Sequence, residues 1–167
     1  DLWGIGTDNQ RIPSDEEIAA AESLVNYKDI LLRPEDHSVK LAKAGMSIDL
    51  GGIAKGYAVD EVRAIFAKHH IENGLINLGA SSMYALGSNA KGGPWRIGIK
   101  HPRNDDKDTY LGIVAVSNEN ISTSGDYERF FEENGVRYHH IFDPKTGRPA
   151  RSGVMSDSVL IDSSIEH

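Results

Sequence analysis

The chain has 167 residues, 39% hydrophobic and 26% charged, which is enough for one domain with a real core. Its net charge of −7, with no run of Lys and Arg, argues against a general nucleic-acid-binding protein. A single phosphorylated ligand stays possible, because it needs only local positive potential. The absence of cysteine excludes disulfides, thiolate catalysis and cysteine-ligated zinc. The sequence holds no apolar run of the roughly 18 residues that would indicate a membrane-spanning helix.

The first predicted element is a helix. Ser14 and Glu17 have the spacing of a capping box, and the apolar periodicity that follows extends to about Asn26. Residues 29–50 then predict short strands around turns, because apolar residues partly alternate at Val39, Leu41, Met46, Ile48 and Leu50. We therefore expect a β-type run that stops at two glycines.

A second helix is predicted over residues 53–69, with an apolar stripe along one side. From there the pattern is mainly β, and Asn134-Gly135 between two such segments is a strong hairpin signal. The predicted strands are residues 75–78, 95–100, 110–116, 127–132, 136–142 and 158–161. These elements predict a single α+β domain over residues 1–167, with two main helices against an antiparallel sheet.

The junction around the second helix start has the features of an anion site. Gly51 and Gly52 let the backbone approach a ligand, and a helix N-terminus presents unpaired N–H groups and positive potential. Asp49 and Lys55 add one charge of each sign. The spacing fits neither the Walker loop nor the dinucleotide fingerprint. A tight turn whose glycines only permit close packing explains the same pattern, so both interpretations stay open here.

Two other segments carry small or hydroxyl residues after predicted strands. Gly79 lies in the turn at 77–82, whose backbone groups would suit a flat ligand. Ser122 and Thr123, followed by Ser124, would suit phosphate or ribose. Taken alone, each segment is explained at least as well by an ordinary turn.

Two adjacent histidines follow the Asn134-Gly135 turn. Neighbouring residues of a strand face opposite sides, so His139 and His140 make a poor joint metal site. One of them as a general base is chemically better founded, since the pKa of imidazole lies near neutrality. A purely structural histidine remains the alternative.

Taken together and in this order, these segments resemble one family, the ApbE-type FAD:protein FMN transferases, formerly labelled thiamine-biosynthesis lipoproteins. The most specific matches are DLGGIAKGYA at 49–58 and RYHHIFDPKTG at 137–147. Shorter matches run along most of the chain, at residues 2–6, 13–18, 27–30, 77–79 and 121–125.

The resemblance implies a T-fold-like α+β protein that is exported and often lipid-anchored, and hence an extracytoplasmic location. It implies a Mg²⁺-dependent reaction in which FAD is split at its pyrophosphate. FMN would be joined to a Ser or Thr of a target protein, and AMP would leave. The implied targets are flavoprotein subunits of membrane redox complexes.

The same resemblance assigns roles to single residues. His140 would be the base that removes the proton of the incoming hydroxyl, and Gly52 would offer its backbone carbonyl oxygen to Mg²⁺, which accepts such ligands. The resemblance and the turn patterns together predict the residues that contact FAD: Asp49, Lys55, Gly79, Ser122, Thr123, Ile141 and Phe142.

The sequence also departs from the family. The family's segment before the Trp-Gly motif and its C-terminal metal-binding helix have no counterpart here, and Asp157 and Asp162 do not match that helix's ligands. We therefore expect a partial transferase that binds FAD and Mg²⁺ weakly and does not turn over alone. Three alternatives remain: an FAD pyrophosphatase that uses water as acceptor, a non-catalytic FAD-binding module, and a scaffold without ligand.

Overall fold

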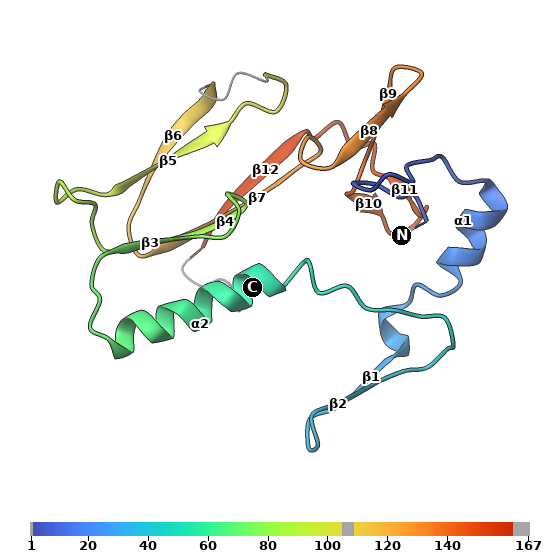
Figure 1. The fold of residues 1–167 in the computed structure, drawn as a ribbon, viewed down its shortest axis with the longest axis horizontal. Helices are drawn as coiled ribbons and strands as arrows, with labels where there is room; N and C mark the ends of the chain where they lie inside the picture. The colour runs from blue at the N-terminus through green and yellow to red at the C-terminus, as the bar shows by residue number, and fades with distance from the viewer. Residues whose placement is uncertain (1, 105–108, 162–167) are drawn as a thin grey trace. The chain divides into compact units, whose positions relative to one another are not determined.

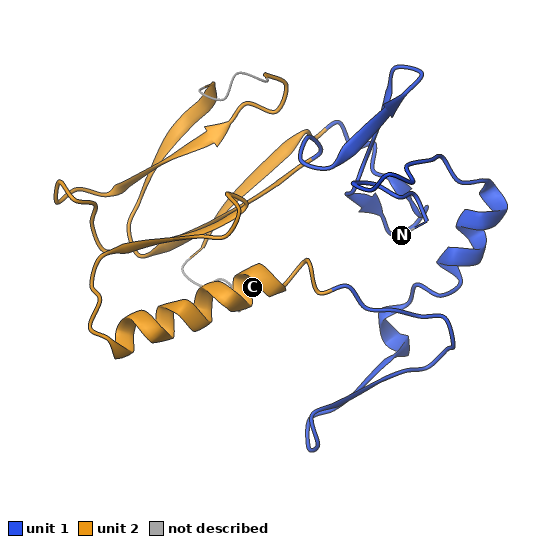
Figure 2. Ribbon diagram, in the orientation of Figure 1, with its two compact units in different colours: residues 1–49, 126–153 blue, residues 50–125, 154–167 orange. Residues whose placement is uncertain are grey.

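The computed structural model describes residues 2–104 and 109–161. These fall into two compact units, shown in Figure 2. Unit 1 is built from residues 1–49 and 126–153, and unit 2 from residues 50–125 and 154–167. Neither unit is a continuous stretch of chain, so both depend on contacts between residues distant in sequence.

Unit 2 is organised around a four-stranded antiparallel sheet with the strand order β12-β7-β4-β3. A separate antiparallel hairpin, β5–β6, completes the described strands of this unit. The bounds are β3 Gly74–Asn77, β4 Ser82–Leu86, β5 Trp95–Lys100, β6 Tyr110–Val116, β7 Glu119–Gly125 and β12 Ser156–Ile161.

The sheet of unit 2 is covered on both faces, because its strands alternate. On one face Tyr84 packs with Ile76 and with Val59 of helix α2 (Ala54–Lys68). On the other face β4 and β7 pack against the β5–β6 hairpin through Ala85, Ile97, Val116 and Ile121. Figure 1 shows the resulting helix–sheet–hairpin order. The sequence signal for α2 is confirmed to within one residue at each end.

The residues just before α2 differ from the prediction. Residues 46–50 form no strand, and the two apolar side chains Ile48 and Leu50 are 43% and 58% exposed. The predicted β-type run that stops at the two glycines is therefore wrong for residues 46–50. Alternation indicates a strand only where one face becomes buried, and here neither side chain is. A turn over residues 51–53 leads into the helix instead.

Unit 1 consists of short elements. Its strands form three two-stranded antiparallel sheets, β1–β2, β8–β9 and β10–β11. The bounds are α1 Asp15–Glu22, the 3₁₀ turn η1 Tyr27–Asp29, β1 Ile30–Arg33, β2 Ser38–Leu41, β8 Phe130–Glu133, β9 Val136–His139, β10 Phe142–Asp143 and β11 Arg148–Pro149.

The local signals of unit 1 are confirmed at the start of α1 and at the hairpin turn. Ser14 and Glu17 form the expected capping box. Asn134 and Gly135 both have positive φ, 52° and 74°, as a type I′ turn requires. Helix α1 ends at Glu22, however, four residues before the predicted end. There the hydroxyl of Ser23 bonds back to the carbonyl oxygen of Ala20, an alternative to further helix.

The core of unit 1 is small and centred on Trp3, which is 5% exposed. Its ring stacks on Tyr138 with 5.7 Å between centroids, and its Nε1–H donates to the carbonyl oxygen of Gly147 at 3.1 Å. Ile18 of α1, which lies close to Gly147, is buried as well. Residues far apart in the chain are thus joined around one tryptophan.

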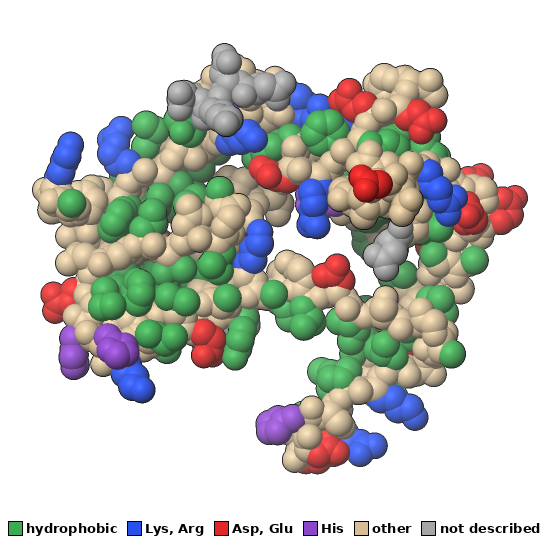
Figure 3. All heavy atoms as spheres, viewed as in Figure 1, with side chains coloured by type: hydrophobic (Ala, Val, Ile, Leu, Met, Phe, Trp, Pro, Cys, Tyr) green, Lys and Arg blue, Asp and Glu red, His purple; other side chains and the backbone are tan. Residues whose placement is uncertain are grey.

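The β1–β2 hairpin leaves apolar surface open. Leu31, Leu32 and Val39 are 50%, 67% and 57% exposed, and charged residues surround its turn, as Figure 3 shows. None of the described helices is both long and apolar enough to cross a membrane. The predicted α+β class, with antiparallel strands and two α-helices, is confirmed.

Candidate functional site

Lys55 lies in the first turn of α2, and its side chain reaches the turn between β3 and β4. Its Nζ donates to the Oγ of Ser81 at 2.5 Å. A Cβ added at Gly79 would lie 3.8 Å from the same Nζ. No described side chain caps the N-terminus of α2. The helix start, one ammonium group and the glycine turn are therefore brought together in unit 2.

The turn beneath Lys55 is unusually constrained. Gly79 and Ala80 both have positive φ, 68° and 59°, and for alanine this conformation is unfavourable. The Oδ1 of Asn77 accepts the N–H of Ala80 at 2.8 Å. The N–H of Leu78 donates to the carbonyl oxygen of Ser82 at 2.9 Å. Such strain persists only where the surroundings impose it, and it is frequent at ligand sites.

Ser122 and Thr123 lie on β7 but point to opposite faces of the sheet. The Oγ of Ser122 lies 3.4 Å from that of Ser82, whereas Thr123 pairs with Ser158 at 2.8 Å between their hydroxyl oxygens. Because the two side chains alternate, they do not present one joint surface to a ligand. The binding role predicted for each stays a prediction.

Ser122 belongs to a buried polar group that the sequence reading did not identify. Asn120, 1% exposed, donates from Nδ2 to the Oγ of Ser122 at 3.0 Å, and Ser82 is 4% exposed. The Oδ1 of Asn120 is buried without a described hydrogen-bond partner. The signal available in the sequence was a polar residue directly beside the apolar Ile121. If such an amide is buried, it requires hydrogen-bond partners nearby.

The described residues do not by themselves supply a Mg²⁺ site. Gly52 is exposed in the turn before α2 and offers only its backbone oxygen, while Mg²⁺ requires about six oxygen ligands. Over residues 2–104 and 109–161, no group of three or more His, Asp or Glu side chains has a metal-binding arrangement. Asp49 is exposed, and Asp162 lies outside the described residues.

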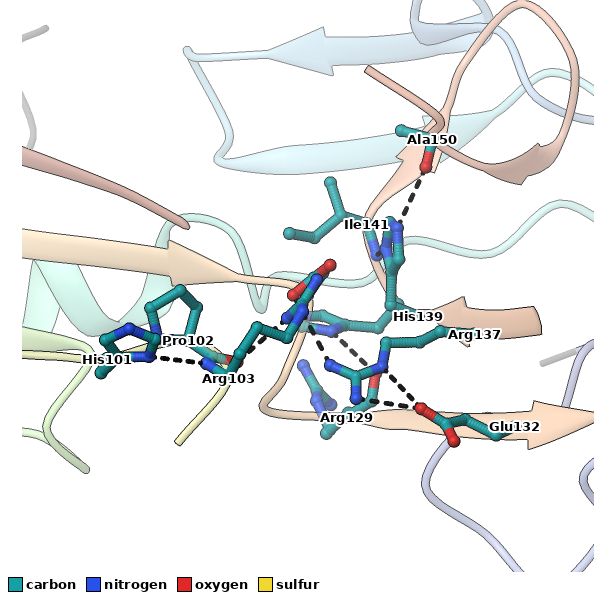
Figure 4. A network of polar contacts seen from close by, with 11 residues as sticks. His101, Pro102, Arg103, Arg129, Glu132, Arg137, His139, Ile141 and Ala150 are labelled. Carbon is teal, nitrogen blue, oxygen red and sulfur yellow. Dashed lines mark hydrogen bonds and ion pairs between the residues drawn. The ribbon is translucent and has the colours of Figure 1, made fainter. Parts of the chain in front are cut away.

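The two histidines have different hydrogen bonds, and these fix their tautomers. His139 is 8% exposed, and its Nδ1 accepts the N–H of Ile141 at 3.3 Å. Its Nε2 therefore carries the proton and donates to the carbonyl oxygen of Ala150 at 3.0 Å, as Figure 4 shows. Both nitrogens of His139 are engaged, so this histidine is structural.

His140 has the opposite tautomer. Its Nδ1 lies 3.2 Å from the carbonyl oxygen of Arg129, which can only accept, so Nδ1 carries the proton. Nε2 is then the unprotonated nitrogen. Burial, the largest cause, lowers the pKa of His140 below its ordinary value of 6.5. The imidazole is consequently neutral at neutral pH and has a basic lone pair on Nε2.

Ile141 and Phe142 follow directly in unit 1. The N–H of Ile141 is bonded to His139, and its carbonyl oxygen accepts the N–H of Ala150 at 2.9 Å. Phe142 is 40% exposed and its ring lies 6.1 Å from that of Trp3. The backbone polar groups of Ile141 thus serve the fold, while the ring of Phe142 offers open apolar surface.

The predicted residues therefore form two groups, one in each unit. Unit 2 brings together Lys55 and Gly79, with Ser122 in the buried polar group of its sheet. Unit 1 contains His140, Ile141 and Phe142. Sequence reasoning did not single out Ser81 of unit 2, which belongs to the small-residue turn and whose Oγ accepts a hydrogen bond from Lys55.

Comparison with known proteins identifies the family. The model of the ApbE family matches residues 1–166. The chain belongs to the ApbE family. It is 37% identical to the FAD:protein FMN transferase of Treponema pallidum (strain Nichols), over 95% of this chain and 47% of that protein. It is 36% identical to the protein of the same name from Klebsiella pneumoniae (strain 342), over 99% and 50%.

Solved structures of ApbE proteins also match this chain. The crystal structure of the ApbE protein from Thermotoga maritima matches with a TM-score of 0.86 and 41% identity, over 98% of this chain and 52% of that chain. The flavin transferase ApbE from Vibrio cholerae matches with a TM-score of 0.80 and 34% identity, over 98% and 51%. The chain thus spans about half the length of the ApbE relatives it matches.

Proposed function

We propose that the protein containing this chain is an FAD:protein FMN transferase. The observation that carries the proposal is the similarity to curated transferases of that name along almost the whole chain. The tautomer of His140 supports it independently, because the reaction needs a neutral base.

In the proposed reaction a Ser or Thr hydroxyl of a target protein attacks the phosphorus of the FMN half of FAD. A new P–O bond forms to that hydroxyl oxygen, and the P–O bond to the bridging oxygen breaks. AMP leaves with the bonding electron pair. Nε2 of His140 accepts the hydroxyl proton, while the Nδ1–H bond to Arg129 holds the ring. Phosphoryl transfer of this kind depends mainly on positioning and charge neutralisation.

The proposed seat of the diphosphate is the start of α2. Lys55 supplies one positive charge there, and the uncapped helix end adds the potential of its N–H groups. Asp49, Gly79, Ser122, Thr123, Ile141 and Phe142 stay predicted contacts with the rest of FAD. Their contribution is expected to be smaller, because none of them neutralises the diphosphate.

Several further features are proposals that rest on the family resemblance. They are a requirement for Mg²⁺, a target flavoprotein subunit of a membrane redox complex, and a lipid-anchored extracytoplasmic location. The described residues supply no donor set for Mg²⁺ beyond the Gly52 carbonyl, so no step is assigned to the metal. Loss of transfer on chelation with EDTA, restored by added Mg²⁺, would support the requirement.

The decisive experiment compares the wild-type protein with His140→Gln. FMN-labelled target peptide is followed by mass spectrometry and AMP by chromatography, while FAD affinity is measured by titration. Loss of a general base should reduce transfer about 10²- to 10⁴-fold with FAD affinity nearly unchanged. For the wild type, the rate should rise with pH through a pKa below 6.5 and then level off, because only the neutral imidazole accepts a proton.

The matched control is His139→Gln, which removes the other imidazole of the pair. It should lower thermal stability, because two hydrogen bonds are disturbed. The pH profile should keep its single rise, moved slightly to higher pH, because His139 also lowers the pKa of His140. Normal transfer by His140→Gln would disprove the assignment of the base. Formation of AMP and free FMN at equal rates with and without the target peptide would instead indicate a pyrophosphatase.

A further inference from the structure

Ser81 is the only described side chain that the structure shows bonded to the ammonium group of Lys55. We propose that Ser81 is a positioning residue for the diphosphate of FAD: it holds Lys55 Nζ at the turn and directs the remaining N–H groups to the ligand. This inference rests on the proposed function, since it concerns the same seat.

The need for positioning follows from the lysine side chain. Lys55 is exposed, and a free lysine side chain has many rotamers, so fixing it costs conformational entropy. A partner that orders the side chain before the ligand arrives reduces this cost of binding. An ammonium group has three donors, so the bond to Ser81 leaves two for phosphate oxygens.

The structure makes Ser81 a firm anchor. Its carbonyl oxygen accepts the N–H of Thr123 on β7 at 2.9 Å, and the next residue, Ser82, starts β4 and is buried. On the other side the strained Gly79-Ala80 turn is tied by the side chain of Asn77. The flexible partner of the pair is therefore the lysine, and the fixed partner is the serine.

The turn also leaves the space beside the ammonium group of Lys55 open at Gly79. Gly79 has no side chain, and the position of its Cβ would lie 3.8 Å from the Nζ of Lys55. A larger residue there would occupy space beside the ammonium group.

The test measures the affinity for FAD of the protein containing this chain, as wild type, Ser81→Ala, Lys55→Met and the double variant. Ser81→Ala should weaken FAD binding by up to about tenfold, because the long lysine side chain must then be ordered when the ligand binds. Lys55→Met should weaken it at least as much. In the Lys55→Met background, Ser81→Ala should change the affinity by less than about twofold, because Ser81 acts through the lysine.

Two further measurements separate positioning from a general effect on the fold. Ser81→Thr keeps the hydroxyl and should restore affinity to within about threefold of the wild type. Inorganic pyrophosphate should compete with FAD less well in Ser81→Ala than in the wild type. Ser117→Ala is the matched control: it removes a hydroxyl that bonds the carbonyl oxygen of Gly87 in the same unit, and should not alter FAD affinity.

The outcomes are distinguishable. If Lys55→Met weakens binding and Ser81→Ala does not, the role of Ser81 is wrong and the proposed diphosphate seat survives. An equal loss from Ser81→Ala in both backgrounds would also overturn the inference, since Ser81 would then act independently of Lys55. If Lys55→Met binds FAD normally, the seat itself is misplaced. If Ser81→Ala melts at a much lower temperature than the wild type, the FAD affinity of Ser81→Thr relative to the wild type decides whether Ser81 is a positioning residue.

Discussion

The two units of this chain are stabilised in different ways. Unit 2 has a layered core in which Val59, Val116 and Ile121 are at most 2% exposed. Unit 1 has three two-stranded sheets and is held mainly by Trp3 and by polar contacts between distant segments. Unit 2 therefore offers a rigid support for Lys55, whereas the surroundings of His140 depend on a few specific hydrogen bonds.

The largest expected difference comes from removing apolar atoms in each unit. Val59→Ala in unit 2 should lower the free energy of unfolding by about 2–3 kcal/mol, because two buried methyl groups are lost and a cavity remains. Leu32→Ala in unit 1 should change it by less than about 0.5 kcal/mol, since Leu32 is 67% exposed. Urea unfolding followed by circular dichroism measures both, and equal effects would contradict the contrast.

A smaller effect is expected at the centre of unit 1. Trp3→Phe keeps an aromatic ring beside Tyr138 but removes the Nε1–H that donates to the carbonyl oxygen of Gly147. The expected cost is about 1–2 kcal/mol. Hydrogen exchange should localise the loss of protection to residues 126–153, and loss confined to the sheet of unit 2 would refute the assignment.

The smallest effect concerns the capping box of α1. The hydrogen bond from Arg11, and then that from the Ser14 backbone, lower the pKa of Glu17 from 4.5 to about 2. Its contribution to stability is therefore present above pH 4.5 and is lost as the pH falls through about 2. The difference in melting temperature between wild type and Glu17→Gln should shrink over that range.

A difference in melting temperature that stays constant down to about pH 2 would show that the charge of Glu17 contributes nothing. Arg11→Met is the complementary variant, because it removes the partner and keeps the carboxylate. In Arg11→Met the pKa of Glu17 should lie closer to 4.5, because the largest cause of its lowering is removed. The stability contributed by the Glu17 charge should therefore be smaller and should be lost at a higher pH, while the bond from the Ser14 backbone to Glu17 remains.

Sequence reasoning succeeded where the signal is local. The capping box at Ser14, the helix after Gly52 and the Asn134-Gly135 turn depend on residues within a few positions of one another, and all three are confirmed. It failed for residues 46–50, where the alternation of apolar residues has no sheet to bury one of its faces.

The candidate site was predictable only in part for the same reason. Lys55 was identified from its place at a helix start, but its partner Ser81 lies 26 positions away and becomes visible only in the fold. The alternation rule treated His139 and His140 as neighbours on one strand, but β9 ends at His139. It did not say which of them is structural, because that depends on the carbonyl oxygens of Ala150 and Arg129.

The strand order β12-β7-β4-β3 has a consequence for synthesis on the ribosome. Strand β7 is complete at Gly125, but its outer neighbour β12 begins only at Ser156. While residues 126–155 are being translated, one edge of β7 has unpaired N–H and C=O groups and is open to other nascent chains. Substitutions that slow elongation or delay formation of unit 1 should therefore increase aggregation during expression, even when they leave the finished protein equally stable.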